Sequence, residues 1–273
     1  MKLSVIVSTF NRADLLNRTL FTYSKQSMPK DDYEVIIIDD QSTDDTESVI
    51  NSFKDKLNLI YARIKGKKEG FRAQSVGWNI GLKIALSEVC LFSHPEIMMP
   101  YKAFKEMCEP HQSYDTPVFL TMKPYFLSMA AQEKIDQIDW KDDADKIKEL
   151  KEFSAGWNYK DQAFTSEYME KLEKWHSNTT FSMKRLDLIG IGGFDEFDRW
   201  GPDDASLRDR RKRLHIKSVI SPLLNYHQNH DSRSGDVRKM DFKTKWYPFA
   251  SSAKLRMKDH SGEYEIVFSY RRV

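Results

Sequence analysis

Two short apolar runs, each followed at once by polar residues, constrain the fold more than any other feature of the chain. Leu3–Val7 and Val35–Ile38 are rich in β-branched residues, and the apolar spacing from Leu15 to Tyr23 predicts a helix between them. Continuous apolar runs of this length are typical of parallel strands that are buried on both faces. The order strand, helix, strand indicates a right-handed βαβ unit and a parallel sheet.

The rest of the chain continues this alternation and then becomes less regular. We expect further strands at 57–62, 89–92, 118–122 and 181–183, a last core strand at 216–220, and helices around 49–53, 73–86 and 186–189. The charged segment 130–153 is patterned like an exposed helix, and the Arg-rich segment 207–214 predicts a solvated one. The pattern indicates the α/β class, with a nucleotide-binding type of sheet in the first half.

Composition excludes several kinds of protein. The 43 basic and 41 acidic residues leave a net charge of +2, which offers no global attraction to nucleic acid. No apolar stretch approaches the roughly 20 residues of a transmembrane segment, and Asn11, Arg12 and Asp14 interrupt the first apolar run too early for a signal peptide. Cys90 and Cys108 cannot supply a disulfide framework. We therefore expect a cytoplasmic protein.

Polar loops follow the first two predicted strands. Ligands of open parallel sheets bind at the carboxyl ends of the strands, where such loops converge. Ser8–Arg12 offers backbone groups and a guanidinium, and Asp39–Asp45 offers carboxylates that can accept hydrogen bonds from a base or a ribose. The plainer alternative for Asp40–Asp44 is a turn and helix cap, because Asp, Ser and Thr favour such positions.

Taken together, these segments resemble the amino-terminal half of the family 2 glycosyltransferases. The resemblance rests on Ser4–Arg12 and Tyr33–Thr46, covers 3 to about 100, resumes at 181 to about 230, and leaves roughly 115–178 unmatched. It implies the GT-A fold, a mixed and mainly parallel sheet flanked by helices in a single domain.

The resemblance also implies a donor site. In that family the two loops hold the nucleobase and ribose of a nucleotide sugar, usually a uridine diphosphate sugar. Carried over to this chain, the task falls to Thr9, Phe10, Arg12 and Asp40, with Asp39 in support. Gly70–Ala73 together with Trp78–Gly81 is similar to the family's Gly-x-x-x-Ala-x-Asn-x-Gly segment. That likeness adds Asn79 to the donor-binding residues and brings Arg72 to the diphosphate.

The chain departs from the family where a metal site is expected. An acidic Asp-x-Asp cluster normally follows the fourth strand and holds a divalent cation on the diphosphate, but here the sequence is His94-Pro95-Glu96. Two readings stay open. Either Glu96 holds Mn²⁺ or Mg²⁺ with help from His227 or His230, or cationic side chains such as Arg72 neutralise the leaving diphosphate. A zinc site formed by His227 and His230 lacks accompanying cysteines.

A second block, at 192–207, resembles the Gly-Gly-Phe-Asp-Glu…Trp-Gly-x-Glu-Asp segment of family 2 enzymes and related galactosyltransferases. Gly192 and Gly193 allow close approach of a sugar, and Trp200 offers a face on which a pyranose ring can stack, so these three form the expected acceptor site. By resemblance Asp204 is the catalytic base that removes the proton from the acceptor hydroxyl, and its neighbour Asp203 binds hydroxyls.

These assignments divide the chain into three functional segments. Residues 1–110 form the nucleotide-sugar-binding half, and 111–240 form the acceptor-binding and catalytic half, with a helical insertion at about 125–178. Residues 241–273 form a carboxyl-terminal extension, read as a covering helix and a final hairpin strand or, alternatively, as an element that contacts a membrane surface or a partner.

Several side chains outside these motifs have plainer expected roles. The aromatic residues of the unmatched stretch serve either the acceptor or the core: Trp140, Trp157, Tyr159 and Trp175. The remaining histidines are expected to be ordinary surface or loop residues: His111, His176, His215 and His260.

The sequence therefore predicts an inverting glycosyltransferase that moves a sugar from a nucleotide diphosphate donor to a hydroxyl of a glycan or glycolipid, at the inner face of a membrane or free of it. One alternative is a degenerate family member that binds nucleotide or glycan without turnover. A nucleotidyltransferase would need a glycine-rich phosphate loop after the first strand, and Ser8–Arg12 is not one.

Overall fold

The computed structural model describes residues 1–66, 74–127, 180–196, 202–230 and 259–270. For 126 and 202–205 it describes the backbone alone. The helical elements of the described residues are α1 Ala13–Ser24, η1 Lys30–Asp32, α2 Thr46–Asn51, α3 Gln74–Ile84, α4 Ala103–Cys108, η2 Glu109–Ser113, α8 Arg185–Gly190 and α9 Pro202–Arg213. The strands are β1 Leu3–Thr9, β2 Tyr33–Asp39, β3 Leu59–Ile64, β4 Val89–Ser93, β5 Ile97–Met98, β6 Val118–Phe126, β7 Phe181–Lys184, β8 Lys217–His227 and β9 Tyr264–Tyr270.

The described strands form one sheet in the order β5-β8-β6-β7-β4-β1-β2-β3-β9. Strands β4, β1, β2 and β3 are mutually parallel, as the apolar runs predict. Antiparallel pairs join β7 to β4 and to β6, β8 to β5, and β9 to β3. Strands from all three predicted segments of the chain thus enter a single mixed sheet, and the α/β fold expected from the sequence is confirmed.

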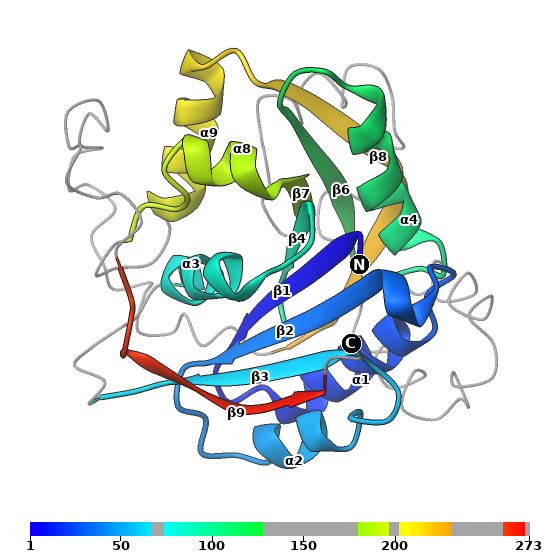
Figure 1. The fold of residues 1–273 in the computed structure, drawn as a ribbon. Coiled ribbons are helices and arrows are strands. Elements are labelled where there is room, and N and C mark those ends of the chain that lie inside the picture. Colours follow the sequence, from blue (N-terminus) through cyan, green and yellow to red (C-terminus); the bar gives the residue numbers. More distant parts are fainter. Residues whose placement is uncertain (67–73, 128–179, 197–201, 231–258, 271–273) are drawn as a thin grey trace.

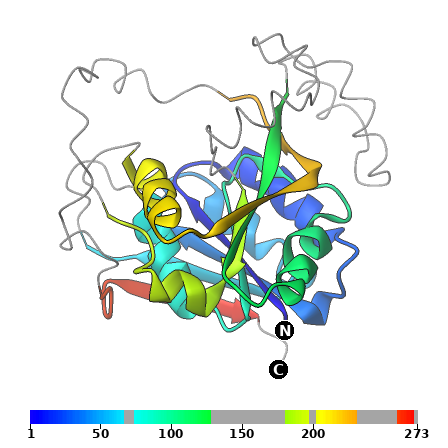
Figure 2. The same ribbon diagram turned by 90° about the horizontal axis from the view of Figure 1, so that it is seen from above.

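Helices cover both faces of this sheet. One face packs against α1, α2 and α4, and the other against α3, α8 and α9, an arrangement visible in Figure 1 and from above in Figure 2. Side chains alternate along β1, so Val5 and Val7 enter the first core whereas Ile6 enters the second. Both faces of the central strands are buried, which is why their sequences are mainly apolar instead of alternating.

Helix α3 lies unusually close to β1 because glycines face the strand. A Cβ atom at Gly77 would collide with the Ser8 side chain, and one at Gly81 would collide with Ile6. The spacing of four residues puts both glycines on one face of the helix. This close packing fixes the position of α3 relative to β1.

The later strands differ from the prediction in two ways. Strand β8 continues through Ser221 and Pro222 to His227, well beyond Ile220. Strand β9 forms as expected in the extension, but it pairs antiparallel with β3 instead of closing a hairpin. The expected helix of the extension, the insertion helix and the four aromatic residues at 140–175 lie outside the described residues.

The prediction that 207–214 is a solvated helix is wrong for one face of α9. Arg211 is only 2% exposed, and its guanidinium lies over the Phe119 ring at 3.5 Å and donates a hydrogen bond to Ser218. Burial and the nearby Arg208 lower the pKa of Arg211 to about 10. Arg213 and Lys212 on the same helix are exposed.

Two of the remaining histidines are not surface residues. His111 is fully buried, and its Nε2 lies 2.9 Å from Ser182 Oγ. Because the Ser182 hydroxyl donates its proton to the Met107 carbonyl, the Nε2–H of His111 donates to Ser182 Oγ. Burial lowers the pKa of His111 to about 4, so the ring is neutral. His260 is also buried and belongs to the site described below, whereas His215 is exposed. His176 lies outside the described residues.

Candidate functional site

The loops after β1 and β2 are joined side by side at the carboxyl edge of the sheet. Thr9 pairs with Asp39 in register, and the Asp40 amide donates to the Thr9 carbonyl at 2.9 Å. Asn11 and Gln41 both take left-handed conformations, with φ of 48° and 65°. Gln41 thus takes a backbone conformation that glycine adopts most readily.

Cross-links between the two loops fix this arrangement. Asn11 donates its amide N–H to Ser42 Oγ at 2.8 Å, and its side-chain oxygen accepts from the Thr43 amide at 2.6 Å. Asp44 accepts from the Ala13 amide at the start of α1 and from Thr46 at the start of α2. Burial raises the pKa of Asp44, but these hydrogen bonds outweigh it and hold the pKa below its ordinary value. The turn-and-cap reading therefore describes Asp44 correctly.

The predicted donor-binding residues of the two loops differ in their surroundings. Asp39 is fully buried, and its carboxylate accepts hydrogen bonds from Ser42, from the Tyr61 hydroxyl at 2.7 Å and from Arg63 at 3.4 Å. It therefore supports the turn from behind. Thr9 lies at the adjoining strand end with its buried hydroxyl unsatisfied by any described residue. Phe10 and Arg12 are half-buried in the first loop, and Arg12 precedes α1.

The structure brings together the three side chains predicted as metal ligands. His227 Nε2 and His230 Nε2 each lie 3.9 Å from Glu96 Oε1, and a ligand atom from each of the three residues falls within 4.8 Å of the others. His94 Nδ1 is 3.8 Å from the same carboxylate oxygen. One carboxylate oxygen is thus surrounded by imidazoles from two segments that are 130 residues apart.

Helix α1 holds these two segments together. Thr19 donates its hydroxyl proton to the Pro95 carbonyl at 2.7 Å and accepts from Gln228 Nε2 at 3.1 Å. Gln228 also donates to the Leu15 carbonyl, and its own amide donates to the Glu96 carbonyl at 2.9 Å. Strand β5 pairs with β8 so that Ile97 faces His227. Contacts within the chain therefore hold the two segments of the cluster beside each other.

The protonation states in the cluster suit a cation. Burial raises the pKa of Glu96, but His94, His227 and His230 outweigh that effect, so its pKa lies below the ordinary value. Burial lowers the pKa of His227, although Glu96 opposes the shift. An ionised carboxylate and a neutral imidazole are the forms that bind metals, so this donor set fits a divalent ion.

Asn79 is committed to the protein itself. It is fully buried, accepts from the Phe194 amide at 2.9 Å, and donates to the Phe194 carbonyl and to Glu196 at 2.7 Å. His260 Nε2 reaches the same Glu196 oxygen at 2.6 Å, and His260 Nδ1 reaches Glu263 at 2.6 Å. The side-chain amide of Asn79 thus ties α3 to the Gly-Gly-Phe-Asp-Glu loop. Its role in donor binding stays a prediction.

Helix α9 holds the other side of that loop. Gly192 and Gly193 have φ of 97° and 64° and form the turn that ends α8. Arg210 donates to the carbonyls of Ile191 and Gly193, at 3.0 and 2.6 Å, and pairs with Asp195 at 2.5 Å. The two glycines are needed for this turn, whatever they do for a sugar.

The predicted base lies at the start of the same helix. Pro202 begins α9, so the backbone of Asp203 and Asp204 forms its first turn, as Pro at that position favours. Their side chains, together with the whole of Arg72 and Trp200, lie outside the described residues.

Sequence reasoning missed the residues that organise the site: Thr19, Gln228, Arg210, Glu196 and His260. Gln228 lies between the two predicted ligands His227 and His230, and Glu196 lies in the Gly-Gly-Phe-Asp-Glu block, so their positions were the available signals. Thr19, Arg210 and His260 act through tertiary contacts that no local pattern reveals.

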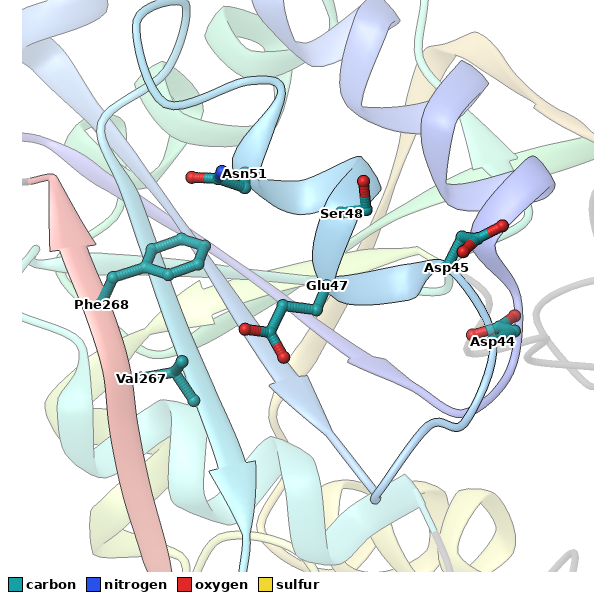
Figure 3. Close-up of a pocket in the computed structure, with 7 residues that line it drawn as sticks. All are labelled: Asp44, Asp45, Glu47, Ser48, Asn51, Val267 and Phe268. Carbon is teal, nitrogen blue, oxygen red and sulfur yellow. The ribbon is translucent and has the colours of Figure 1, made fainter.

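A pocket of about 670 Å³ lies between α2 and β9, next to the end of the second loop (Figure 3). It is lined by Asp44, Asp45, Glu47, Ser48, Asn51, Val267 and Phe268. Three of its polar lining residues are acidic, and Glu47 is paired with Arg63 at 2.7 Å. Carboxylates repel a diphosphate, so we do not assign the donor to this pocket.

The family comparison agrees with the geometry. The model of Glycosyl transferase family 2 matches residues 4–131, which include both polar loops and Glu96. Validoxylamine A glucosyltransferase from Streptomyces hygroscopicus subsp. jinggangensis is 29% identical over 237 residues, covering 80% of this chain and 53% of that protein. The chain spans about half the length of the curated relatives that it matches first.

Solved structures show the same fold. Staphylococcus aureus TarS 1-349 in complex with UDP-GlcNAc has a TM-score of 0.59 at 19% identity, covering 85% of this chain and 60% of that one. The mannosyltransferase PcManGT from Pyrobaculum calidifontis, in complex with GDP-Man and Mn²⁺, has a TM-score of 0.56 at 17% identity, covering 86% and 58%. Residues 4–131 are thus similar to glycosyl transferase family 2, and the described strands form a GT-A fold like that of these neighbours.

Proposed function

We propose that this chain is an inverting glycosyltransferase that moves a sugar from a uridine diphosphate sugar to a hydroxyl of a glycan or glycolipid. The observation that carries the proposal is the convergence of Glu96, His227 and His230 just beyond β4, at the sheet edge that also carries the Thr9 and Asp40 loops. The family match and the nucleotide-sugar complexes of TarS and PcManGT support it.

In this proposal the two loops bind the nucleoside. The Thr9 hydroxyl, which no described residue satisfies, and the carboxylate of Asp40 would bind the base and the ribose. Asp39 accepts a hydrogen bond that stabilises the turn. Arg12 and Phe10 complete the loop, and Arg72 reaches the diphosphate. The residues that bind the nucleoside then lie together, at the carboxyl ends of two adjacent parallel strands.

Glu96, His227 and His230 would hold a divalent cation, Mn²⁺ or Mg²⁺, on the diphosphate. A bound cation stabilises the charge that develops on the leaving diphosphate. The chain itself holds the three ligand groups in place through Thr19 and Gln228.

Asp204 would remove the proton of the acceptor hydroxyl as that oxygen attacks the anomeric carbon and the diphosphate departs from the opposite side. Asp203 would bind acceptor hydroxyls, and Gly192, Gly193 and Trp200 would shape the acceptor site.

None of the helices among the described residues has the length and hydropathy of a membrane span. In this proposal a glycolipid acceptor would bring this part of the chain to a membrane surface.

The test is a donor-consumption and transfer assay with a panel of UDP- and GDP-sugars, with and without EDTA. We expect Asp204→Asn to lower kcat about 10²–10⁴-fold with nucleotide affinity retained, because general base catalysis contributes that much. Asp209→Asn, farther along the same helix, serves as the matched control and should keep wild-type turnover. Tight nucleotide binding with no turnover in the wild-type chain would instead support the binding-only alternative.

A further inference from the structure

The donor set of the cluster differs in kind from a pair of carboxylates. Among the described residues, Glu96 supplies one hard oxygen and His227 and His230 supply two imidazole nitrogens. Carboxylates suit Mg²⁺, Ca²⁺ and Mn²⁺, whereas imidazole suits the later first-row metals, whose affinities rise toward Zn²⁺ and Cu²⁺. A third imidazole, His94, stands 3.8 Å from the same carboxylate oxygen. The cluster therefore favours metals that accept nitrogen.

The ring of His227 is already turned for ligation. Its Nδ1 lies 2.9 Å from the Gln228 carbonyl, which can only accept, so Nδ1 carries the proton. The lone pair of the neutral ring is then on Nε2, the atom that faces Glu96 at 3.9 Å. A backbone carbonyl on the second ring nitrogen is the usual device that fixes a metal-binding imidazole.

Hydrogen bonds from α1 hold together the two segments that carry the cluster. Thr19 bonds to the segment that carries Glu96 and to the segment that carries the histidines, and Gln228 joins both to the Leu15 carbonyl. His227 and His230 also stack at 5.3 Å with an interplanar angle of 26°. Ligand atoms on a common metal lie roughly 3.0–3.5 Å apart, so the three atoms, which lie within 4.8 Å of one another, must move closer together when a metal binds.

We propose that Glu96, His227 and His230 bind one transition-metal ion without nucleotide, preferring Zn²⁺ and Co²⁺ to Mn²⁺ and all three to Mg²⁺. The inference rests on the proposed function only in taking this cluster as the place that the donor diphosphate meets. In this inference, the residues that replace Asp-x-Asp form a site that binds its metal before the nucleotide. The imidazole nitrogens determine which metal the site prefers.

The test is a metal-binding titration of the full chain without nucleotide, using Zn²⁺, Co²⁺, Mn²⁺ and Mg²⁺ separately against a chromophoric chelator. We expect one Co²⁺ per chain, with visible absorption bands of nitrogen-ligated cobalt, and affinity about tenfold or more above that for Mn²⁺. His230→Ala and His230→Gln should each weaken Co²⁺ binding about 10- to 100-fold. Far-ultraviolet circular dichroism checks that each variant is folded.

The matched control is His215→Asn, which changes an exposed histidine whose left-handed backbone (φ 53°) Asn tolerates. It should leave Co²⁺ affinity unchanged. Equal affinity for Mg²⁺ and Co²⁺, unchanged binding in a folded His230 variant, or binding only after UDP is added would each overturn the inference. None of these readouts involves sugar transfer, so a failure of the proposed activity is distinguishable from a failure of the site.

Discussion

At the scale of single residues, close packing at one glycine sets the position of α3. Gly81 is buried against Ile6 of β1, and a Cβ there would need the strand side chain to move. Gly81→Ala should therefore lower the free energy of unfolding by about 1–2 kcal/mol, since overpacking costs more than the gain in helix propensity. Urea unfolding measures the change.

Gly190 provides the matched control. It ends α8, its φ is not positive, and an added Cβ meets nothing within 4 Å. Gly190→Ala should stay within about 0.5 kcal/mol of the parent chain. Equal effects of the two substitutions would show that the α3–β1 contact is less tight than described.

At the scale of elements, one arginine attaches α9 to the Gly-Gly-Phe-Asp-Glu loop. Arg210→Ala removes the guanidinium that donates to two carbonyls and pairs with the carboxylate of Asp195, which keeps only the hydrogen bond from Ser206. Because Asp195 is only 13% exposed, we expect a loss of about 2–4 kcal/mol in the free energy of unfolding. Arg213→Ala removes an exposed arginine from the same helix and should change stability by less than about 0.5 kcal/mol. Chemical denaturation of both variants decides the point.

The contact between His260 and Glu196 joins the carboxyl-terminal segment to the same loop and should make stability depend on pH. The hydrogen bond to Glu196 raises the pKa of His260 above 6.5, burial opposes the shift, and Glu263 adds to it. A group whose pKa is raised on folding stabilises the protein fully below its unfolded pKa, and that stabilisation is lost as pH rises through the folded pKa.

The measurement is the melting temperature of the parent chain and of His260→Gln between about pH 5.5 and 9. The advantage of the parent chain should be largest near the acid end and shrink as pH rises above 6.5. An advantage that stays constant across this range, or that grows with pH, would contradict a protonated His260 between two carboxylates.

At the scale of the whole molecule, much of the fold was readable from pattern alone. The buried parallel strands could be predicted because both faces of β1 and β2 are covered, so most of their residues are apolar. The length of β8 was not readable. Ser221-Pro222 looks like a strand end, but the register with β6 shifts there, and a proline is tolerated at such a bulge.

The site divides in the same way. The resemblance to family 2 predicts Glu96, His227 and His230 as metal ligands, and the structure brings them together; their role as ligands stays a proposal. Thr19 and Gln228 could not be found, because their importance lies in contacts between α1 and two distant segments. The partner of β9 was hidden for the same reason, since pairing with β3 spans about 200 residues.

The most direct test of the whole account is a crystal structure with UDP and Mn²⁺, with anomalous scattering used to locate the metal. The account predicts an anomalous peak beside Glu96, His227 and His230, with the diphosphate on that ion and uridine against Thr9 and Asp40. UDP bound elsewhere, such as in the acidic pocket between α2 and β9, or a metal peak remote from Glu96, would contradict it.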